Sequence, residues 1–198
     1  MERPLPPQDS LRERKQRRAR QAIIEAAHAL FEERGFDRVT VTDIAERAEV
    51  GRATFFRYFG DKREVVFSAD PRGEAELLEA AERIPADAPI GDSLPAALAY
   101  LRRAVSLLVE GLVQDPDAYL AHERLVARNP ELLDRSVAKQ RRYVDLMVGL
   151  LGERGADRGT SVLAAEIGLA CFYAGRAETG DDPRRLPGCV DAAFARLL

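Results

Sequence analysis

The segment TVTDIAERAEVGRATFFRYFGDK, residues 40–62, decides the fold of this chain. Thr40 and Asp43 have the spacing of a capping box, in which each side chain bonds the other residue's backbone N–H, so a helix is expected to begin here. Glu49-Val50-Gly51 is predicted to be a turn, and a second short helix is expected over residues 52–59. Two short helices joined by three residues predict a helix-turn-helix.

The second short helix is expected to have an inner and an outer face. Phe55 and Phe59 lie four residues apart and are expected to lock it to a core, with the small Ala45 where the two helices cross. Aromatic clusters are usually core, but Phe56 cannot share the inner face with Phe55 on so short a helix. The outer face is expected to carry Arg52, Ala53, Phe56 and Arg57.

These residue types suit a DNA duplex. Arg52 and Arg57 can bond guanine edges or phosphates, while Ala53 and the Phe56 ring suit thymine methyls or sugars. Hydroxyl and ammonium groups at the flanks can bond phosphates, and the flanking residues are Thr54, Tyr58 and Lys62. A helix-turn-helix that makes only protein contacts is the alternative.

Charge along the chain is uneven. The net charge is −3, yet residues 1–65 carry 14 Lys/Arg against 12 Asp/Glu. A basic cluster in which Glu13 is the only acidic residue consists of Arg12, Arg14, Lys15, Arg17, Arg18 and Arg20. Such a cluster is either a solvated helix face or a contact for a polyanion. Its position on the helix that buttresses the helix-turn-helix favours DNA.

The remaining sequence also predicts helices. Apolar residues recur at three- and four-residue steps, and no alternating segment is long enough for a strand. Further helices are expected near residues 72–83, 94–112, 117–128, 130–151, 160–178 and up to 198. Asn129 is expected to cap the helix that follows it. The fold is predicted to be all-α, with a helix-turn-helix DNA-binding domain at 12–66 and a helical ligand-binding and dimerisation domain at 67–198.

Composition excludes several classes of protein. The 198 residues are 46% hydrophobic and 32% charged, which is typical of a globular protein. No stretch without charge exceeds nine residues, whereas a membrane span needs about 20 apolar residues. The proline-rich N-terminus has no apolar core of a secretory signal, and two cysteines make no disulfide framework. A cytoplasmic protein without a membrane span is expected.

Residues 40–62, within a match over about 18–66, resemble the signature of TetR-family transcriptional regulators. The Phe55–Phe59 run followed by Val65-Val66-Phe67 is most similar to actinobacterial-type members, including mycofactocin-associated regulators. The resemblance implies a homodimeric repressor that binds a palindromic operator on double-stranded DNA. It places Thr42, Arg52, Ala53, Thr54, Phe56, Tyr58 and Lys62 at DNA-contacting positions.

Three residues depart from the family pattern. Glu49 replaces the usual turn glycine, at a position that favours the left-handed conformation. Gly51 replaces the usual Ser or Thr cap, which costs only a few tenths of a kcal/mol. Phe56 replaces a common phosphate-binding tyrosine, so the hydroxyl contact is expected to be missing.

The family resemblance implies that the second domain binds a small-molecule effector and forms the dimer. An apolar lining suggests a hydrophobic effector, and the candidate lining residues are Tyr100, Tyr119, His122, Tyr143 and Phe172. Each could instead be an ordinary packing or surface residue. The last two helices are expected to pair with their copies, or to be core, through Val162, Ile167, Leu169, Phe172, Val190, Phe194 and Leu197, with Gly168, Ala170 and Ala174 allowing close approach.

Two other functions are alternatives to a DNA-binding regulator. The sequence has two histidines, in different predicted elements, and contains no Cys-x-x-Cys, His-Glu-x-x-His or phosphate-loop motif. An enzyme is therefore not expected, and neither a cofactor nor a metal is predicted. The second rival is a basic amphipathic arm that binds anionic lipid or a protein partner, which predicts no preference for duplex DNA.

Overall fold

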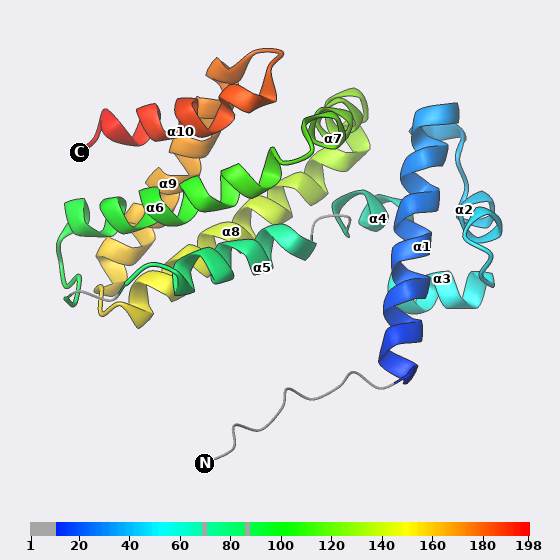
Figure 1. Ribbon diagram of the computed structural model, residues 1–198, viewed down its shortest axis with the longest axis horizontal. Helices are drawn as coiled ribbons and strands as arrows, with labels where there is room; N and C mark the ends of the chain where they lie inside the picture. Colours follow the sequence, from blue (N-terminus) through cyan, green and yellow to red (C-terminus); the bar gives the residue numbers. More distant parts are fainter. Residues whose placement is uncertain (1–10, 69–70, 86–87) are drawn as a thin grey trace. The chain divides into compact units, whose positions relative to one another are not determined.

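The computed structural model describes residues 11–68, 71–85 and 88–198. The described residues form helices, with one isolated bridge between Gly91 and Ala156 and no named strand (Figure 1). The chain divides into two compact units, one up to Ala69 and one from Asp70. The predicted all-α fold class is confirmed.

The first unit is built around a long helix. Its elements are α1 (Leu11–Arg34), the 3-10 helix η1 (Phe36–Arg38), α2 (Val41–Arg47), α3 (Arg52–Tyr58) and α4 (Lys62–Ser68). Figure 1 shows α2 and α3 beside α1, and all three pack together. The expected domain boundary between residues 66 and 67 falls inside α4. The structure keeps α4 whole in this unit because Val65 and Val66 are fully buried.

Local signals at the helix ends explain these bounds. α1 ends before Gly35, whose φ of +80° lies in the region that favours glycine. The predicted capping box is confirmed, since the Asp43 N–H donates to Thr40 Oγ1 at 3.1 Å and the Thr40 N–H to Asp43 Oδ2 at 2.8 Å. Asp61 caps α4 by accepting the Glu64 N–H at 2.8 Å.

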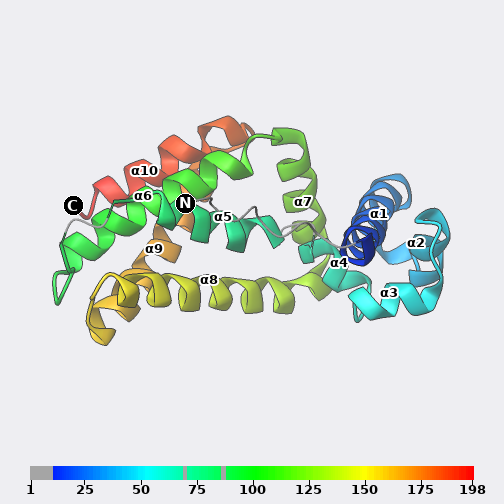
Figure 2. The same ribbon diagram turned by 60° about the horizontal axis from the view of Figure 1, so that its bottom comes forward.

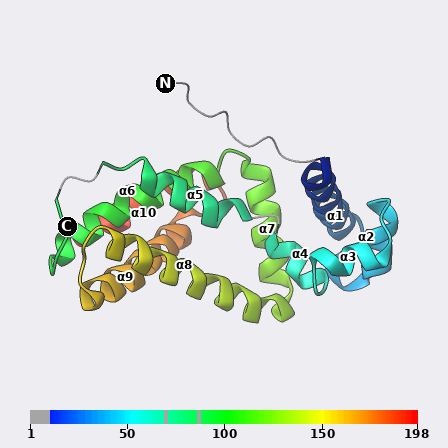
Figure 3. The same ribbon diagram turned by 90° about the horizontal axis from the view of Figure 1, so that it is seen from below.

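The second unit is a bundle around α9. Its elements are α5 (Pro71–Glu82), α6 (Leu94–Leu112), α7 (Pro116–Arg128), the 3-10 helix η2 (Pro130–Leu132), α8 (Leu133–Glu153), α9 (Arg158–Thr179), the 3-10 helix η3 (Pro183–Arg185) and α10 (Leu186–Ala195). Helix α9 packs against α6, α8 and α10. Figure 2 shows α9 between α6 and α8, and Figure 3 shows α8 crossing α9 in the view from below.

The role expected for Asn129 was wrong. Its side-chain Nδ2 donates to the Leu125 carbonyl at 2.6 Å, so Asn129 closes the end of α7. It makes no side-chain capping bond to the element that follows, because η2 intervenes before α8 begins at Leu133. The Asn129 side chain therefore bonds the preceding helix and not the one that follows.

Helices α9 and α10 touch at their backbones. A Cβ on Gly175 would lie 2.6 Å from both Cα and N of Val190, which only glycine permits. Val190 and Phe194 are fully buried within the unit, and Gly168 faces Leu101 and Met147. The expectation that Val190, Phe194 and Gly168 meet a second copy was wrong, since these residues form intramolecular core.

Replacing Gly175 tests this close approach. We expect Gly175→Ala to lower the free energy of unfolding of the second unit by about 1–3 kcal/mol, because backbone cannot move aside as a flexible side chain can. Gly149→Ala is the matched control, because Gly149 is exposed inside α8. A Cβ added there would have no atom within 4 Å beyond its chain neighbours and the nearby backbone of α8. Alanine there should stabilise by up to about 1 kcal/mol through helix propensity. Calorimetric melting of both variants measures the difference, and equal melting temperatures would contradict the contact.

The helix-turn-helix turn contains a strained residue. Glu49 has a φ of +54°, the one positive φ among the described non-glycine residues. This conformation costs a side-chain-bearing residue roughly 1–2 kcal/mol. Glu49 occupies the turn position at which the family pattern has glycine, so the positive φ agrees with the expectation.

We expect Glu49→Gly to stabilise the first unit by about 0.5–1 kcal/mol, the relief of strain less the added chain entropy of glycine. Glu46→Gly is the control, because Glu46 is exposed inside α2, where glycine should cost up to about 1 kcal/mol. Thermal unfolding followed by circular dichroism compares the two. A loss of stability in both variants would show that Glu49 is not strained.

Candidate nucleic-acid interface

The inner face of α3 is anchored by two phenylalanines. Phe55 is 0% and Phe59 1% exposed, and their ring centroids are 5.6 Å apart. From α1, the Arg20 guanidinium lies over the Phe59 ring at 5.4 Å. The prediction that these two rings hold α3 to the core is confirmed.

The outer face of α3 is open to solvent. Arg52, Ala53 and Arg57 are exposed, and the Phe56 side chain is 50% exposed. The Arg57 guanidinium lies 5.0 Å from the Tyr58 ring centroid and its Nη2 donates to the Tyr58 hydroxyl at 3.4 Å. Phe56 therefore does point away from the core, as predicted, and α3 presents two guanidinium groups around an exposed ring. Thr54 and Tyr58 are half-buried at its flanks.

Helix α2 is fastened to α1 by charged groups. Arg47 donates to both carboxylate oxygens of Glu33, at 2.9 and 2.7 Å, and this bonding lowers the pKa of Glu33. Hydrogen bonds from Thr40 lower the pKa of Asp43. The Glu33–Arg47 pair thus joins α1 to α2, while Asp43 caps the start of α2. Thr42 is half-buried in the first turn of α2.

Lys62 makes contacts within the first unit. Its Nζ donates to the Phe36 carbonyl at 2.8 Å and lies 4.2 Å from the Phe36 ring centroid. The structure thus uses the ammonium to tie α4 to η1. The sequence pattern gave no sign of this contact, because the two residues are 26 positions apart.

The basic cluster lies on the first half of α1. Arg12, Arg14, Lys15, Arg17 and Arg18 are exposed, whereas Arg20 is half-buried against Phe59. Five cations on one exposed stretch, in the unit that carries α3, form an electropositive surface that attracts phosphates.

The five residues predicted to line an effector pocket lie in the second unit, on the four helices α6, α7, α8 and α9. Tyr100 is buried on α6 under the Arg154 guanidinium, 5.0 Å from its ring, and burial raises the pKa of its hydroxyl. Arg154 also donates from Nη2 to the carbonyls of Ala81 and Ile84. Tyr100 therefore packs beneath a bridge between α5 and the end of α8.

The other four predicted lining residues are half-buried: Tyr119, His122, Tyr143 and Phe172. The Tyr119 hydroxyl is buried with no hydrogen-bond partner among the described residues, and burial raises its pKa. The Phe172 ring packs edge-on against Tyr173 at 5.3 Å, and Lys139 lies over Tyr143 at 5.7 Å. None of the five predicted residues lines the groove between α6 and α10.

Within the described ranges, no group of three or more His, Cys, Asp or Glu side chains is arranged to hold a metal ion. Among the same residues, every helix is too short or too polar to cross a membrane.

Comparison with known proteins identifies the helix-turn-helix. Residues 23–69 match the family of bacterial regulatory proteins, tetR family. The HTH-type transcriptional regulator TcmR of Streptomyces glaucescens is 39% identical over 124 residues, which cover 62% of this chain and 54% of TcmR. The matched segment thus spans about half the length of this relative.

Solved structures share the fold over nearly the whole chain. A TetR-family transcriptional regulator from Streptomyces coelicolor superposes with a TM-score of 0.56 at 22% identity, covering 91% of this chain and 94% of that one. SmeT of Stenotrophomonas maltophilia, in complex with triclosan, gives a TM-score of 0.56 at 18% identity, covering 90% of each chain. The matched segment, with its anchored and outward faces, identifies residues 23–69 as a helix-turn-helix of the tetR family of bacterial regulatory proteins. The chain as a whole shares the helical fold of these solved regulators.

Proposed function

We propose that this chain is a ligand-responsive transcriptional regulator that inserts α3 into the major groove of an operator. The outward face of α3 carries the proposal, because Arg52, Phe56 and Arg57 are exposed while Phe55 and Phe59 anchor the helix from behind. A recognition helix needs both properties at once. In this proposal the exposed Ala53 contacts a base or sugar, and Thr42, Thr54 and Tyr58 contact phosphates.

Lys62 has a narrower role in this proposal. Its ammonium is already bonded to the Phe36 carbonyl, so it supports α4 and reaches a phosphate only through its remaining N–H donors. The exposed cations of α1 supply the sequence-independent attraction that brings the duplex to the protein. An operator in bacterial DNA puts this activity in the cytoplasm.

We further propose that two copies bind one palindromic operator through surfaces on α9 and α10. Besides the charged Arg158, Glu166 and Glu178, the residues left exposed on these helices include small and apolar ones that allow close helix packing. They are Val162, Leu163, Ala170, Ala174 and Ala177 on α9, with Gly188, Ala192 and Ala195 on α10. A two-fold dimer fits two half-sites about 34 Å apart, so a shift of a few ångströms would prevent both copies from docking.

We propose that a small hydrophobic effector regulates DNA binding by releasing the protein from the operator. The chain bound to its operator would then act as a repressor. SmeT, a structural relative, is described with triclosan bound and as the repressor of an efflux pump. An effector moves such an equilibrium only through its different affinity for the two states, typically by about 1–3 kcal/mol.

The outer face of α3 can be tested directly. Duplexes bound by the wild-type protein are first selected from a random-sequence pool, and we expect a palindrome among them. Arg52→Ala and Arg57→Ala should each weaken binding to that duplex by about 10-fold or more, because a bidentate contact to a base contributes about 1–3 kcal/mol. A gel shift at fixed salt measures the change.

Arg184→Ala is the matched control, since Arg184 is an exposed arginine of the second unit and its loss changes the net charge equally. It should leave binding within about twofold. Unchanged binding in both α3 variants would refute the assignment of the reading face. Binding of anionic vesicles without preference for a duplex would favour the rival lipid-binding arm.

A further inference from the structure

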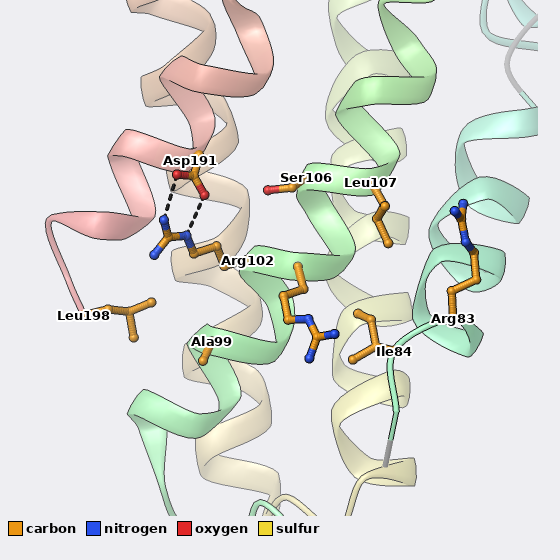
Figure 4. Close-up of a pocket in the computed structure, with 9 residues that line it drawn as sticks. Arg83, Ile84, Ala99, Arg102, Ser106, Leu107, Asp191 and Leu198 are labelled. Atoms are coloured by element: carbon orange, nitrogen blue, oxygen red, sulfur yellow. Dashed lines mark hydrogen bonds and ion pairs between the residues drawn. The ribbon is translucent and has the colours of Figure 1, made fainter. Parts of the chain in front are cut away.

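A groove of about 520 Å³ lies in the second unit between α6 and α10. Its lining residues come from the two positions after α5, from α6, from α10 and from the last residue given: Arg83, Ile84, Ala99, Arg102, Arg103, Ser106, Leu107, Asp191 and Leu198 (Figure 4). Small-molecule sites in proteins have volumes of about 300–1,000 Å³. The groove therefore has the size of a ligand site.

The groove is positively charged in a unit that is otherwise acidic. Residues 66–198 carry 16 Lys/Arg against 21 Asp/Glu, yet three arginines and a single carboxylate line the groove. Arg102 is held by Asp191, to which its Nε and Nη2 donate at 2.6 and 2.7 Å. A guanidinium has five N–H donors, so three of those on Arg102 remain for another acceptor.

Apolar side chains line the space between these arginines. Figure 4 shows Leu107 and Ile84 between Arg102 and Arg83, and Ala99 and Leu198 near Arg102. Ile84 is buried, whereas Arg83 and Arg103 are exposed. A cationic rim over an apolar surface matches a molecule with an anionic head and an aliphatic chain. The head would accept hydrogen bonds from the guanidinium groups, and the chain would be buried against apolar side chains.

We propose that this groove binds an anionic amphiphile, a carboxylate with an aliphatic chain. Its carboxylate accepts hydrogen bonds from Arg102 and Arg103, with Arg83 and the Ser106 hydroxyl beside them. Its chain lies along Leu107 and Ile84. The groove holds none of the five residues predicted from sequence to line an effector pocket. Its use as an effector site rests on the proposed regulatory function, but binding itself does not.

Titration calorimetry with laurate, below its micellar concentration, tests the proposal without DNA. We expect one laurate per chain, and we expect dodecanol, which has the same chain and no charge, to bind at least about fivefold more weakly. The double variant Arg83→Gln/Arg103→Gln should lower the affinity for laurate at least about fivefold and leave the affinity for dodecanol unchanged. Two solvent-exposed charge pairs together change an affinity by up to about tenfold. Leu107→Ser should weaken both ligands.

The matched control is Arg158→Gln/Arg184→Gln, which removes two exposed arginines of the same unit outside the groove. It should bind laurate like the wild type, and circular dichroism verifies that both double variants are folded. The proposal is overturned if laurate does not bind, if both double variants weaken it equally, or if dodecanol binds as tightly. None of these results bears on operator binding, whose failure would appear only in the gel shift.

Discussion

The arrangement of the first unit depends on burial of two phenylalanines on one face of a helix of seven residues. Phe55 and Phe59 are four positions apart, so both side chains point into the core, and each buried ring contributes roughly 1.5–3 kcal/mol. A helix this short does not form alone in water. Its position, and hence the direction of its outer face, is therefore set by these two rings and by the core of α1 behind them.

That constraint explains why much of the first unit could be predicted from sequence. The capping box of Thr40 and Asp43, the stop at Gly35 and the cap at Asp61 are local signals that need no tertiary information. The opposite orientations of Phe55 and Phe56 follow from helical geometry alone. Glu49 was visible as a misfit because the position needs a positive φ, and the structure has one.

What could not be predicted depends on contacts between distant parts of the chain. The bond from Lys62 to the Phe36 carbonyl, the Arg154 bridge over Tyr100 and the Arg102–Asp191 pair join residues 26 to 89 positions apart. An apolar stripe does not reveal which neighbour it meets. Val190 and Phe194 were therefore expected at a dimer seam, with core as the alternative, and the structure places them in the core. For the same reason, aromatic residues on four helices did not predict where a cavity would form.

Helix α10 takes part both in the close contact with α9 and in the groove beside α6. This helix meets α9 backbone to backbone at Gly175, and it is tied to α6 by the Arg102–Asp191 pair beside the groove. A ligand that engages Arg102 thus acts on the contact that fixes α10 against α6. Because α10 also carries part of the proposed dimer surface, ligand binding and dimer geometry would share one element.

The central claim is that the outer face of α3 touches DNA while its inner face does not leave the core. The most direct measurement is photo-crosslinking with p-benzoylphenylalanine in place of Phe56, using a duplex selected by the wild-type protein. The same residue in place of Leu78, which is 40% exposed on α5, is the comparison. The account predicts a protein–DNA crosslink from position 56 and none from position 78. A duplex that binds tightly but crosslinks from neither position, or only from 78, would contradict it.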